Sequence, residues 1–263
     1  MYLSQDYKIK PEHEVVFPYH SESLLYGAGL YETLKTIKQK PIALNLHLDR
    51  LAKSLNSLNI DYPLSEQKIS EQISDLIKAK NTKQEQRIRI NIFLNKKPTL
   101  IIDCQDLKTT TPNNIISKTL DSTRILPLHK TTSMMEQFLL KSVPSDNSHP
   151  FEYIYTNQQK LLTEGLKTDI IYRCQNQLFT TTGAKLPSIT LKILESALQT
   201  KITARKLKLS ELNNQEITDI YLINSIIDIV RIDQLNSRVF AKQNEATKEL
   251  QQIYLTYLQT TYG

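Results

Sequence analysis

The chain has 263 residues, of which 40% are hydrophobic and 23% charged, so it can bury a core and does not belong to the fibrous or disordered classes. The formal net charge is +6, but the basic residues stand singly or in pairs among acidic ones and do not alternate with aromatic residues. The composition therefore does not favour nucleic-acid binding. The positive charge is compatible with a small anionic substrate but does not indicate one.

Residues 1–108 are expected to form a smaller α/β domain. The first 17 residues lack the apolar stretch of a secretory signal. Strands are expected at 14–20, in a hairpin over 30–44, and at 87–94 and 100–107. Between them, leucines and isoleucines at helical spacing predict helices over 44–60 and 65–80, the second with Ser65 as its N-cap.

Residues 109–122 are polar and carry no helical stripe, so they are interpreted as an interdomain linker. A larger α/β domain is expected over 123–263, beginning with a helix from Thr131. The other expected helices follow 186–190 and cover 209–214 and 244–262, and strands are expected at 151–156, 160–164, 169–174, 177–181, 201–207 and 219–224.

Two features bound the cellular setting. No apolar run approaches the roughly 20 residues that cross a bilayer, so no membrane span is expected. The two cysteines, Cys104 and Cys174, stand far apart without the spacing of a metal or redox site. The expectation is therefore a cytoplasmic protein without a bound metal.

The chain contains only five glycines, and two of them lie in the motif YGAGLYET. Gly27 and Gly29 predict a turn that enters a strand, where positive φ or close backbone approach is needed. Alone, this motif is typical of a plain hairpin entry. Four further motifs follow it in order: LHKTTSMMEQ, TEGLKTDIIYRCQNQLFTT, LPSITLKIL and TDIYLINSIIDIVRI.

Together these five motifs resemble the fold-type IV pyridoxal-phosphate enzymes, a family that includes branched-chain and D-amino-acid aminotransferases and aminodeoxychorismate lyase. The resemblance covers about residues 20 to 235. It implies a two-domain α/β fold like that of D-amino-acid aminotransferase, the cofactor pyridoxal 5'-phosphate, a small-molecule substrate and a homodimer.

The resemblance also implies the residues that act. Lys130 matches the lysine that holds the cofactor as a Schiff base and moves the substrate's α-proton. By periodicity alone Lys130 would be a solvated lysine at a helix N-terminus, where its charge opposes the helix dipole. Glu164 matches the carboxylate that pairs with the pyridine nitrogen, although a turn glutamate before Gly165 is the simpler interpretation of that residue alone.

The cofactor's phosphate needs cations and backbone donors. Arg50 matches the phosphate-binding arginine of the family, and Ser225 matches a hydroxyl that also contacts the phosphate. Ser188 precedes an expected helix, whose first amides at Ile189 and Thr190 would form an anion site. Without the resemblance, Ser188 would be an ordinary N-cap and Ser225 a serine at a strand end.

Tyr31 and Thr33 are expected in the substrate pocket. Thr33 stands near the position where lyases place a hydroxyl that assists elimination, although by itself it is equally typical of a strand residue with high β-propensity. The chain departs from the family at Ala28, Asp169, Ser188 and Met134. It also lacks an Arg-Gly loop after the strand at 87–94, and the cations that could replace that arginine are Lys35, Arg87, Arg89, Lys96 and Lys97.

Three functions follow from the resemblance. The compact length favours aminodeoxychorismate lyase, which forms 4-aminobenzoate and pyruvate for folate synthesis. The first alternative is an aminotransferase acting on branched-chain or other amino acids. The second is a non-catalytic relative used for binding, with a decayed cofactor site, and its support is Ala28, Asp169 and the missing Arg-Gly loop.

Overall fold

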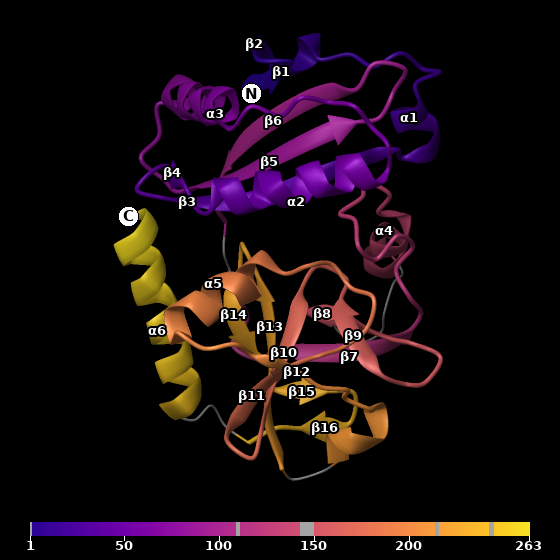
Figure 1. Ribbon diagram of the computed structural model, residues 1–263, viewed down its shortest axis with the longest axis vertical. Coiled ribbons are helices and arrows are strands. Elements are labelled where there is room, and N and C mark those ends of the chain that lie inside the picture. The colour runs from indigo at the N-terminus through magenta and orange to yellow at the C-terminus, as the bar shows by residue number, and fades with distance from the viewer. Residues whose placement is uncertain (1, 109–110, 143–149, 214–215, 242–244) are drawn as a thin grey trace. The chain divides into compact units, whose positions relative to one another are not determined.

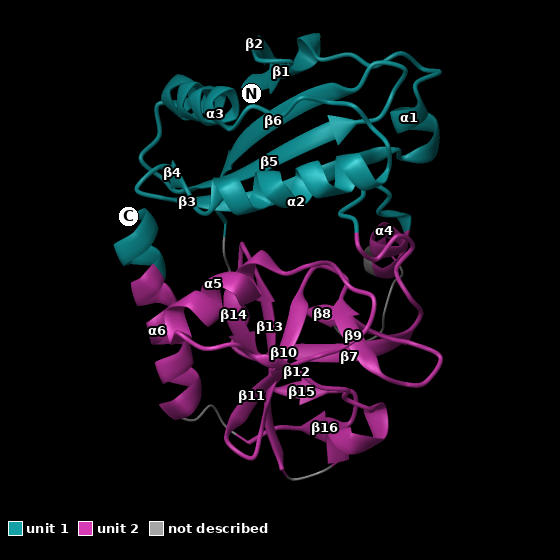
Figure 2. Ribbon diagram, in the orientation of Figure 1, with its two compact units in different colours: residues 1–108, 129–135, 258–263 teal, residues 109–128, 136–257 magenta. Residues whose placement is uncertain are grey.

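The computed structural model describes residues 2–108, 111–142, 150–213, 216–241 and 245–263. The chain divides into two compact units, coloured separately in Figure 2. Unit 1 comprises Met1–Lys108, His129–Met135 and Leu258–Gly263, and unit 2 comprises Thr109–Leu128 and Glu136–Tyr257. The segment His129–Met135 thus groups with the N-terminal residues. The domain boundaries at 108 and 122 stay a prediction.

Unit 1 is built on a six-stranded antiparallel sheet with the strand order β2-β1-β6-β5-β3-β4 (Figure 1). Its strands are β1 (Tyr2–Gln5), β2 (Lys8–Pro11), β3 (Gly29–Ile37), β4 (Lys40–Pro41), β5 (Gln86–Phe93) and β6 (Thr99–Asp106). In the register, Thr33 faces Arg89, and Arg89 faces Asp103. Since side chains alternate between faces along a strand, these three residues share one face of the sheet.

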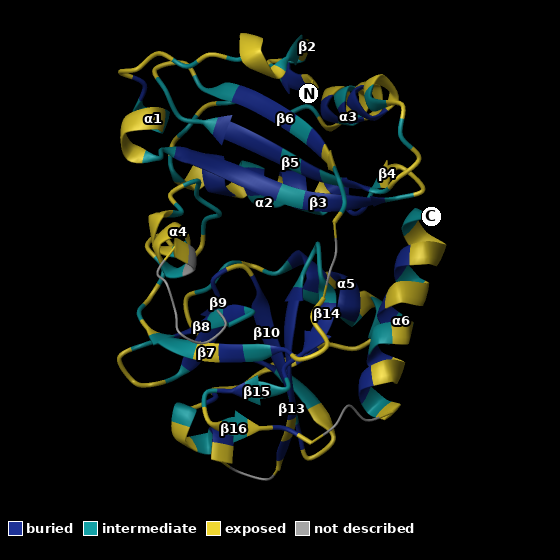
Figure 3. Ribbon diagram, turned by 180° about the vertical axis from the view of Figure 1, so that it is seen from behind, coloured by how far each residue is buried: buried dark blue, intermediate teal, exposed yellow. Residues whose placement is uncertain are grey.

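The other face of this sheet is apolar and lies against two amphipathic helices, α2 (Leu44–Ser57) and α3 (Glu66–Lys80). Figure 3 shows β3, β5 and β6 buried along most of their length. Their core residues are Leu30, Leu34, Ile88, Ile90, Ile92, Leu100 and Ile102, which meet Leu48, Leu51 and Leu55 of α2 and Ile69 and Ile73 of α3. Burying each such side chain stabilises the unit by roughly 1.5 to 3 kcal/mol.

The predicted N-cap of α3 is confirmed, since the Ser65 hydroxyl accepts a hydrogen bond of 3.3 Å from the Lys68 amide. At the other end of α3, Asn81 adopts the left-handed conformation that commonly ends helices. Two short helices, η1 (Glu12–Glu14) and α1 (Glu22–Tyr26), precede β3.

Unit 2 contains two five-stranded sheets around a shared core. One has the order β12-β11-β10-β13-β14 and the other β16-β15-β7-β8-β9. The strands are β7 (Ile116–Asp121), β8 (Glu152–Thr156), β9 (Leu162–Gly165), β10 (Asp169–Cys174), β11 (Gln177–Thr180), β12 (Thr203–Ala204), β13 (Ile217–Asn224), β14 (Asp228–Arg231), β15 (Gln234–Leu235) and β16 (Arg238–Val239). Ile154 and Leu235 of one sheet pack with Ile170, Ile220 and Leu222 of the other.

The remaining helices are α4 (Met135–Ser142), α5 (Ile189–Leu198), the 3-10 helix η2 (Leu209–Asn213) and α6 (Glu245–Tyr262). The helix α5 begins directly after Ser188 and packs on β13. No helix within the described residues is long and apolar enough to cross a membrane.

Four predicted elements differ from the structure. The linker expected over 109–122 contains the strand β7, which pairs within a sheet of unit 2. Residues 15–20 form no strand, and Val16 is 73% exposed there, because no neighbouring strand pairs with the segment before Pro18. The strand expected over 201–207 is reduced to Thr203–Ala204. The helix expected from Thr131 begins only at Met135, which places Lys130 in a different backbone environment.

Candidate active site

The predicted site residues fall into two groups, one in each unit. Tyr31, Thr33, Arg50 and Lys130 belong to unit 1, whereas Glu164, Ile189, Thr190 and Ser225 belong to unit 2. Each group is built from the contacts within its own unit.

Lys130 lies beside the edge of β3 and not at a helix N-terminus. The Tyr31 amide donates to the Lys130 carbonyl at 2.9 Å, and the Thr132 amide donates to the Gly29 carbonyl at 2.8 Å. Leu30 and Thr131 form the bridge between these two hydrogen bonds. The prediction of a helix from Thr131 is wrong here because this backbone hydrogen-bonds to a strand, a long-range pairing that local periodicity does not report.

This pairing places the side chain of Lys130 on the same sheet face as Tyr31. The Lys130 Nζ lies 4.6 Å from the centroid of the Tyr31 ring. Tyr31 itself is 7% exposed, so the amine stands against a buried aromatic surface. A lysine amine in such a place is positioned by the sheet and is not an ordinary solvated side chain.

The glycines of the YGAGLYET motif allow this docking. A Cβ added to Gly29 would come within 2.6 Å of the Thr132 Oγ1. Gly27 has φ of 63°, which suits glycine, and its carbonyl accepts a hydrogen bond of 2.6 Å from the same Thr132 hydroxyl. The close approach of residues 130–132 to β3 therefore requires glycine at position 29.

Arg50 is held by a buried carboxylate that the sequence analysis did not single out. Glu32 of β3 accepts hydrogen bonds from the Arg50 Nε at 2.7 Å and from the Arg50 Nη2 at 2.5 Å. The His47 Nδ1 lies 2.7 Å from Glu32 Oε2. His47 and Arg50 are three residues apart and thus share a face of α2, which was the only available signal of this cluster.

The protonation states of Glu32 and His47 follow from their burial and from the contacts within this cluster. Burial alone would raise the pKa of Glu32, but the charge of Arg50 and the hydrogen bonds from His47 and Arg50 lower it to about 2. Burial lowers the pKa of His47, against the opposing effect of Glu32. Glu32 is therefore ionised and neutral His47 donates to it, so that the Arg50 guanidinium has a fixed orientation.

In unit 2, Glu164 of β9 is a buried carboxylate with few partners. The Leu186 amide donates to its Oε2 at 3.3 Å, and the Arg124 Nε lies 3.4 Å from its Oε1. That Oε1 accepts no hydrogen bond within the described residues. Burial raises the pKa of Glu164 to about 7, against the lowering effect of Arg124 and Leu186.

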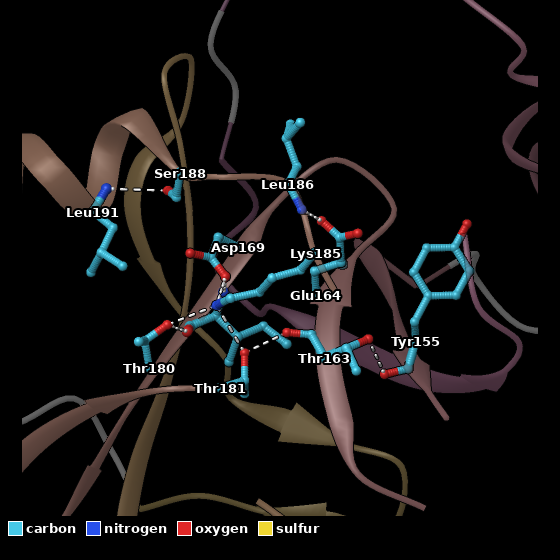
Figure 4. A network of polar contacts seen from close by, with 12 residues as sticks. Tyr155, Thr163, Glu164, Asp169, Thr180, Thr181, Lys185, Leu186, Ser188 and Leu191 are labelled. Atoms are coloured by element: carbon cyan, nitrogen blue, oxygen red, sulfur yellow. Dashed lines mark hydrogen bonds and ion pairs between the residues drawn. The ribbon is translucent and has the colours of Figure 1, made fainter. Parts of the chain in front are cut away.

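Next to Glu164 lies a polar network that contains the partly buried Lys185 (Figure 4). The Lys185 Nζ donates to Asp169 Oδ1 at 2.5 Å, to Thr180 Oγ1 at 2.8 Å and to Thr181 Oγ1 at 3.1 Å. Asp169 is the residue that stands where many relatives carry asparagine. Its pKa is raised by burial, and the charge of Lys185 opposes this effect. The sequence carried no signal for Lys185.

The helix α5 begins shortly after Lys185 and Leu186 in the chain. The Ser188 hydroxyl accepts a hydrogen bond of 3.2 Å from the Leu191 amide, so Ser188 is the N-cap. The amides of Ile189 and Thr190 belong to the first helical turn, which has no acceptors within its own helix. Ser225 lies in the connection from β13 to β14, where Asn224 Oδ1 accepts from the amides of Ile226 and Ile227.

Comparison with known proteins shows what this arrangement resembles. A family described as amino-transferase class IV matches residues 29–235. An aminodeoxychorismate lyase from Bacillus subtilis (strain 168) is 24% identical over 92% of this chain and 90% of its own length.

The solved structures that are similar give the same fold at low identity. A branched-chain aminotransferase from Thermoproteus uzoniensis superposes with a TM-score of 0.87 at 17% identity, covering 99% of this chain and 96% of its own. A hypothetical aminotransferase from Mycobacterium tuberculosis, solved in a pyridoxal-phosphate-bound form, has a TM-score of 0.84 at 15% identity, and the match covers 99% of each chain. The predicted fold-type IV α/β fold is confirmed.

The matching family and the cofactor-bound neighbour support pyridoxal 5'-phosphate as the cofactor. The residues present fit this group. The buried Glu164 Oε1 offers an acceptor for the protonated pyridine nitrogen, and the first-turn amides of α5 suit a phosphate. The described residues contain no cluster of three or more His, Cys, Asp or Glu side chains that could hold a metal ion.

Proposed function

This chain belongs to the class IV aminotransferase family, fold-type IV enzymes that include lyases and aminotransferases, and from this premise we propose that it is a 4-amino-4-deoxychorismate lyase. The products would be pyruvate and 4-aminobenzoate, the latter for folate synthesis. The observation that carries the choice of lyase is the polar sheet face beside Lys130. Thr33, Arg89 and Asn91 share this face with Tyr31, and such a face suits an anionic, oxygen-rich substrate better than a branched alkyl side chain.

In the proposed reaction, Lys130 holds the cofactor and then acts as the base that removes the proton from the substrate carbon bearing the amine. When bound, pyridoxal phosphate supplies an electron sink for the charge that this step leaves on that carbon. Glu164 would accept a hydrogen bond from the pyridine nitrogen and keep it protonated. Because Glu164 lacks a hydrogen bond to Oε1 in the described residues, that acceptor stays available to the ring.

The phosphate would be bound by Arg50, by the first-turn amides of Ile189 and Thr190, and by Ser225. Glu32 supports this role of Arg50 because it binds two nitrogens on one edge of the guanidinium and so fixes its plane. The cap at Ser188 supports the role of α5, since it orders the helix start without occupying the amides of the first two residues.

Tyr31 and Thr33 would line the substrate pocket. Tyr31 lies under the Lys130 amine, and Thr33 follows it on the same face of β3. We propose that Thr33 assists departure of the enolpyruvyl group by a hydrogen bond to its ether oxygen.

An assay of products tests the lyase proposal. Purified protein incubated with pyridoxal phosphate and aminodeoxychorismate should form 4-aminobenzoate and pyruvate in equal amounts. The second candidate, an aminotransferase for branched-chain amino acids, has its support in the similarity to the branched-chain enzyme fold. If 2-oxo acids accept an amino group while no 4-aminobenzoate forms, the lyase proposal is wrong.

A test of Lys130 separates both enzymes from a non-catalytic relative. Protein mixed with pyridoxal phosphate should stay yellow through desalting, and borohydride should fix the cofactor to the peptide containing Lys130. Lys130→Ala should abolish the fixation, while the exposed Lys201→Ala should leave it unchanged. A wild-type protein that stays colourless and unlabelled would exclude both enzymatic functions.

A homodimer is also proposed. Exposed apolar side chains gather in two stretches, which are Val16, Tyr19, Leu24 and Tyr26 in the first and Ile125, Leu128, Met135 and Phe138 in the second. Such concentrations of exposed apolar residues are typical of protein interfaces. Size-exclusion chromatography with light scattering should give twice the mass of one chain, and a monomer at micromolar concentration would contradict the proposal.

A further inference from the structure

Two arginines follow one another on the polar face of the unit 1 sheet. Arg87 and Arg89 of β5 are two residues apart, so their side chains leave the same face. In the register Arg89 lies between Thr33 and Asp103, and Arg87 lies between Lys35 and Gln105. This is the face on which the Lys130 amine stands above Tyr31.

Arg89 shares the aromatic surface of the Lys130 amine. Its guanidinium carbon lies 4.1 Å from the Tyr31 ring centroid, over which the Lys130 Nζ lies at 4.6 Å. Its Nε donates to the Asn91 side-chain oxygen at 2.8 Å, and its Nη2 lies 3.9 Å from the Met134 sulfur. These contacts orient the guanidinium without neutralising its charge.

Neither arginine forms an ion pair within the described residues, although the nearby charge of Asp103 acts on both. Among the described residues, no carboxylate oxygen lies within 4.0 Å of a nitrogen of Arg87 or Arg89, although Asp103 faces Arg89 across the strands. Both side chains are only partly exposed. Partly buried guanidinium groups without a carboxylate are costly in the free protein and are suited to binding anions.

We infer that Arg87 and Arg89 bind the two carboxylates of a dianionic substrate, an inference that rests on the proposed lyase function and names its specificity residues. Their Cα atoms are about 7 Å apart along the strand. Arg89, the one beside the Lys130 amine, would bind the carboxylate on the substituent next to the reacting carbon. Arg87, one row farther along, would bind the carboxylate on the opposite side of the ring.

The proposed substrate has this pattern of charges. In 4-amino-4-deoxychorismate the enolpyruvyl carboxylate hangs from the ring carbon next to the amine, and the second carboxylate lies across the ring from the amine. A branched-chain amino acid carries one carboxylate and would leave Arg87 without a ligand. The arginine pair would also replace the cation of the Arg-Gly loop, which this chain does not have. Lys96 and Lys97 are less suited to that role because they are exposed in the turn after β5.

Stable aromatic acids test the two arginines separately. The probes are 2-aminobenzoate, 4-aminobenzoate and 4-aminoisophthalate, whose carboxylates lie next to the amine, across from it, or at both places. Their dissociation constants would be measured by calorimetry on the full chain purified with pyridoxal phosphate. The dicarboxylate should bind at least about tenfold more tightly than either monocarboxylate, since each charged hydrogen-bonded pair is worth roughly tenfold to a hundredfold.

Each arginine variant should lose affinity for a different probe. Arg87→Gln should weaken 4-aminobenzoate and the dicarboxylate by roughly tenfold or more and leave 2-aminobenzoate unchanged. Arg89→Gln should weaken 2-aminobenzoate and the dicarboxylate and leave 4-aminobenzoate unchanged. Lys96→Gln, which removes an exposed cation after the same strand, should change none of the three constants.

Two results would overturn the inference. One is a dicarboxylate that binds wild-type protein no more tightly than the monocarboxylates, a measurement that needs no variant to fold. The other is a loss that is equal for all probes, or absent, in both arginine variants. Formation of 4-aminobenzoate by the wild-type protein is scored separately, so active lyase with unselective arginines refutes this inference alone. Inactive protein with selective arginines refutes the lyase function alone.

Discussion

Glu32 of unit 1 and Glu164 of unit 2 are both buried, but their pKa values are shifted in opposite directions. Glu32 in unit 1 is 1% exposed and Glu164 in unit 2 is 3% exposed, so burial opposes their ionisation to a similar degree. The pKa of Glu32 is nevertheless lowered to about 2, whereas that of Glu164 is raised to about 7. The partners decide the outcome: Glu32 accepts hydrogen bonds from Arg50 at two atoms and from His47, whereas Glu164 accepts one from a backbone amide and has the Arg124 guanidinium at 3.4 Å, without a hydrogen bond to it.

The difference separates a carboxylate whose hydrogen bonds are all made within the protein from one that keeps an oxygen without a hydrogen bond in the described residues. Glu32 has its charge neutralised by neighbours and serves to orient Arg50. Glu164 keeps a buried oxygen without a hydrogen bond in the described chain, which leaves its ionised form poorly compensated. A protonated pyridine ring would complete its partners, in agreement with the proposed role.

Glu32→Gln should have the largest effect on stability. The substitution leaves the Arg50 cation beside a neutral amide, and breaking such a buried pair costs about 3 kcal/mol. The folded pKa of Glu32 lies below its ordinary value of 4.5, so its contribution is present above pH 4.5 and is lost as pH falls towards 2. Urea unfolding of wild type should show this loss, and the variant should not.

A control for this prediction is Asp121→Asn, which removes an exposed partner of Lys160 and should leave the unfolding midpoint unchanged. A Glu32→Gln protein as stable as wild type at pH 7 would show that the Arg50 charge is compensated elsewhere.

Lys185→Met should have the second-largest effect on stability, because it leaves the Asp169 carboxylate buried beside Glu164 without its cation. We expect a loss of about 2 to 3 kcal/mol in the free energy of unfolding at pH 7. Adding Asp169→Asn removes the uncompensated charge, so the double variant should recover at least half of the loss. A double variant less stable than Lys185→Met would show that the pair acts through packing and not through charge.

Glu164→Gln should raise the stability of the cofactor-free protein at alkaline pH, whereas Glu32→Gln should lower stability. The folded pKa of Glu164 is about 7, above its ordinary 4.5, so between these values the folded protein holds more protons than the unfolded chain. Stability of the cofactor-free protein therefore falls as pH rises through this window, by roughly 2 to 3 kcal/mol. The variant lacks this fall and should be more stable than wild type at pH 8.

Cofactor binding supplies the second readout for Glu164→Gln, which should bind pyridoxal phosphate more weakly despite its higher stability. A variant that is less stable than wild type at pH 8 would contradict the interpretation that Glu164 is short of partners.

The parts of the fold that could be predicted from the sequence are those with local signals. The helices α2 and α3 follow from leucines and isoleucines at helical spacing, and the Ser65 cap follows from its place before that pattern. Periodicity predicts the wrong element around Lys130 because the backbone partners of this segment, Gly29 and Tyr31, lie about a hundred residues earlier in the chain. Periodicity carries no information about such pairings.

The paired charges of the site were harder to predict for the same reason. Glu32 stands on a strand and Lys185 in a loop, where charged residues are usually solvated. Their partners, His47 and Arg50 for Glu32 and Asp169 for Lys185, become visible only once strand and helix are packed together. The roles assigned to Lys130, Glu164, Arg50, Ile189, Thr190, Ser225, Tyr31 and Thr33 came from the resemblance and stay predictions.

The smallest expected changes in stability come from removing the two serine caps, Ser65 of α3 and Ser188 of α5. Ser65 and Ser188 each accept a hydrogen bond from the third helical amide, at 3.3 and 3.2 Å. Ser65→Ala and Ser188→Ala should each cost about 1 kcal/mol in urea unfolding, since both lose a cap. Only Ser188→Ala should also weaken pyridoxal phosphate binding, by several-fold, because the start of α5 is proposed to hold the phosphate. Equal cofactor affinity in the two variants would remove the first turn of α5 from the site.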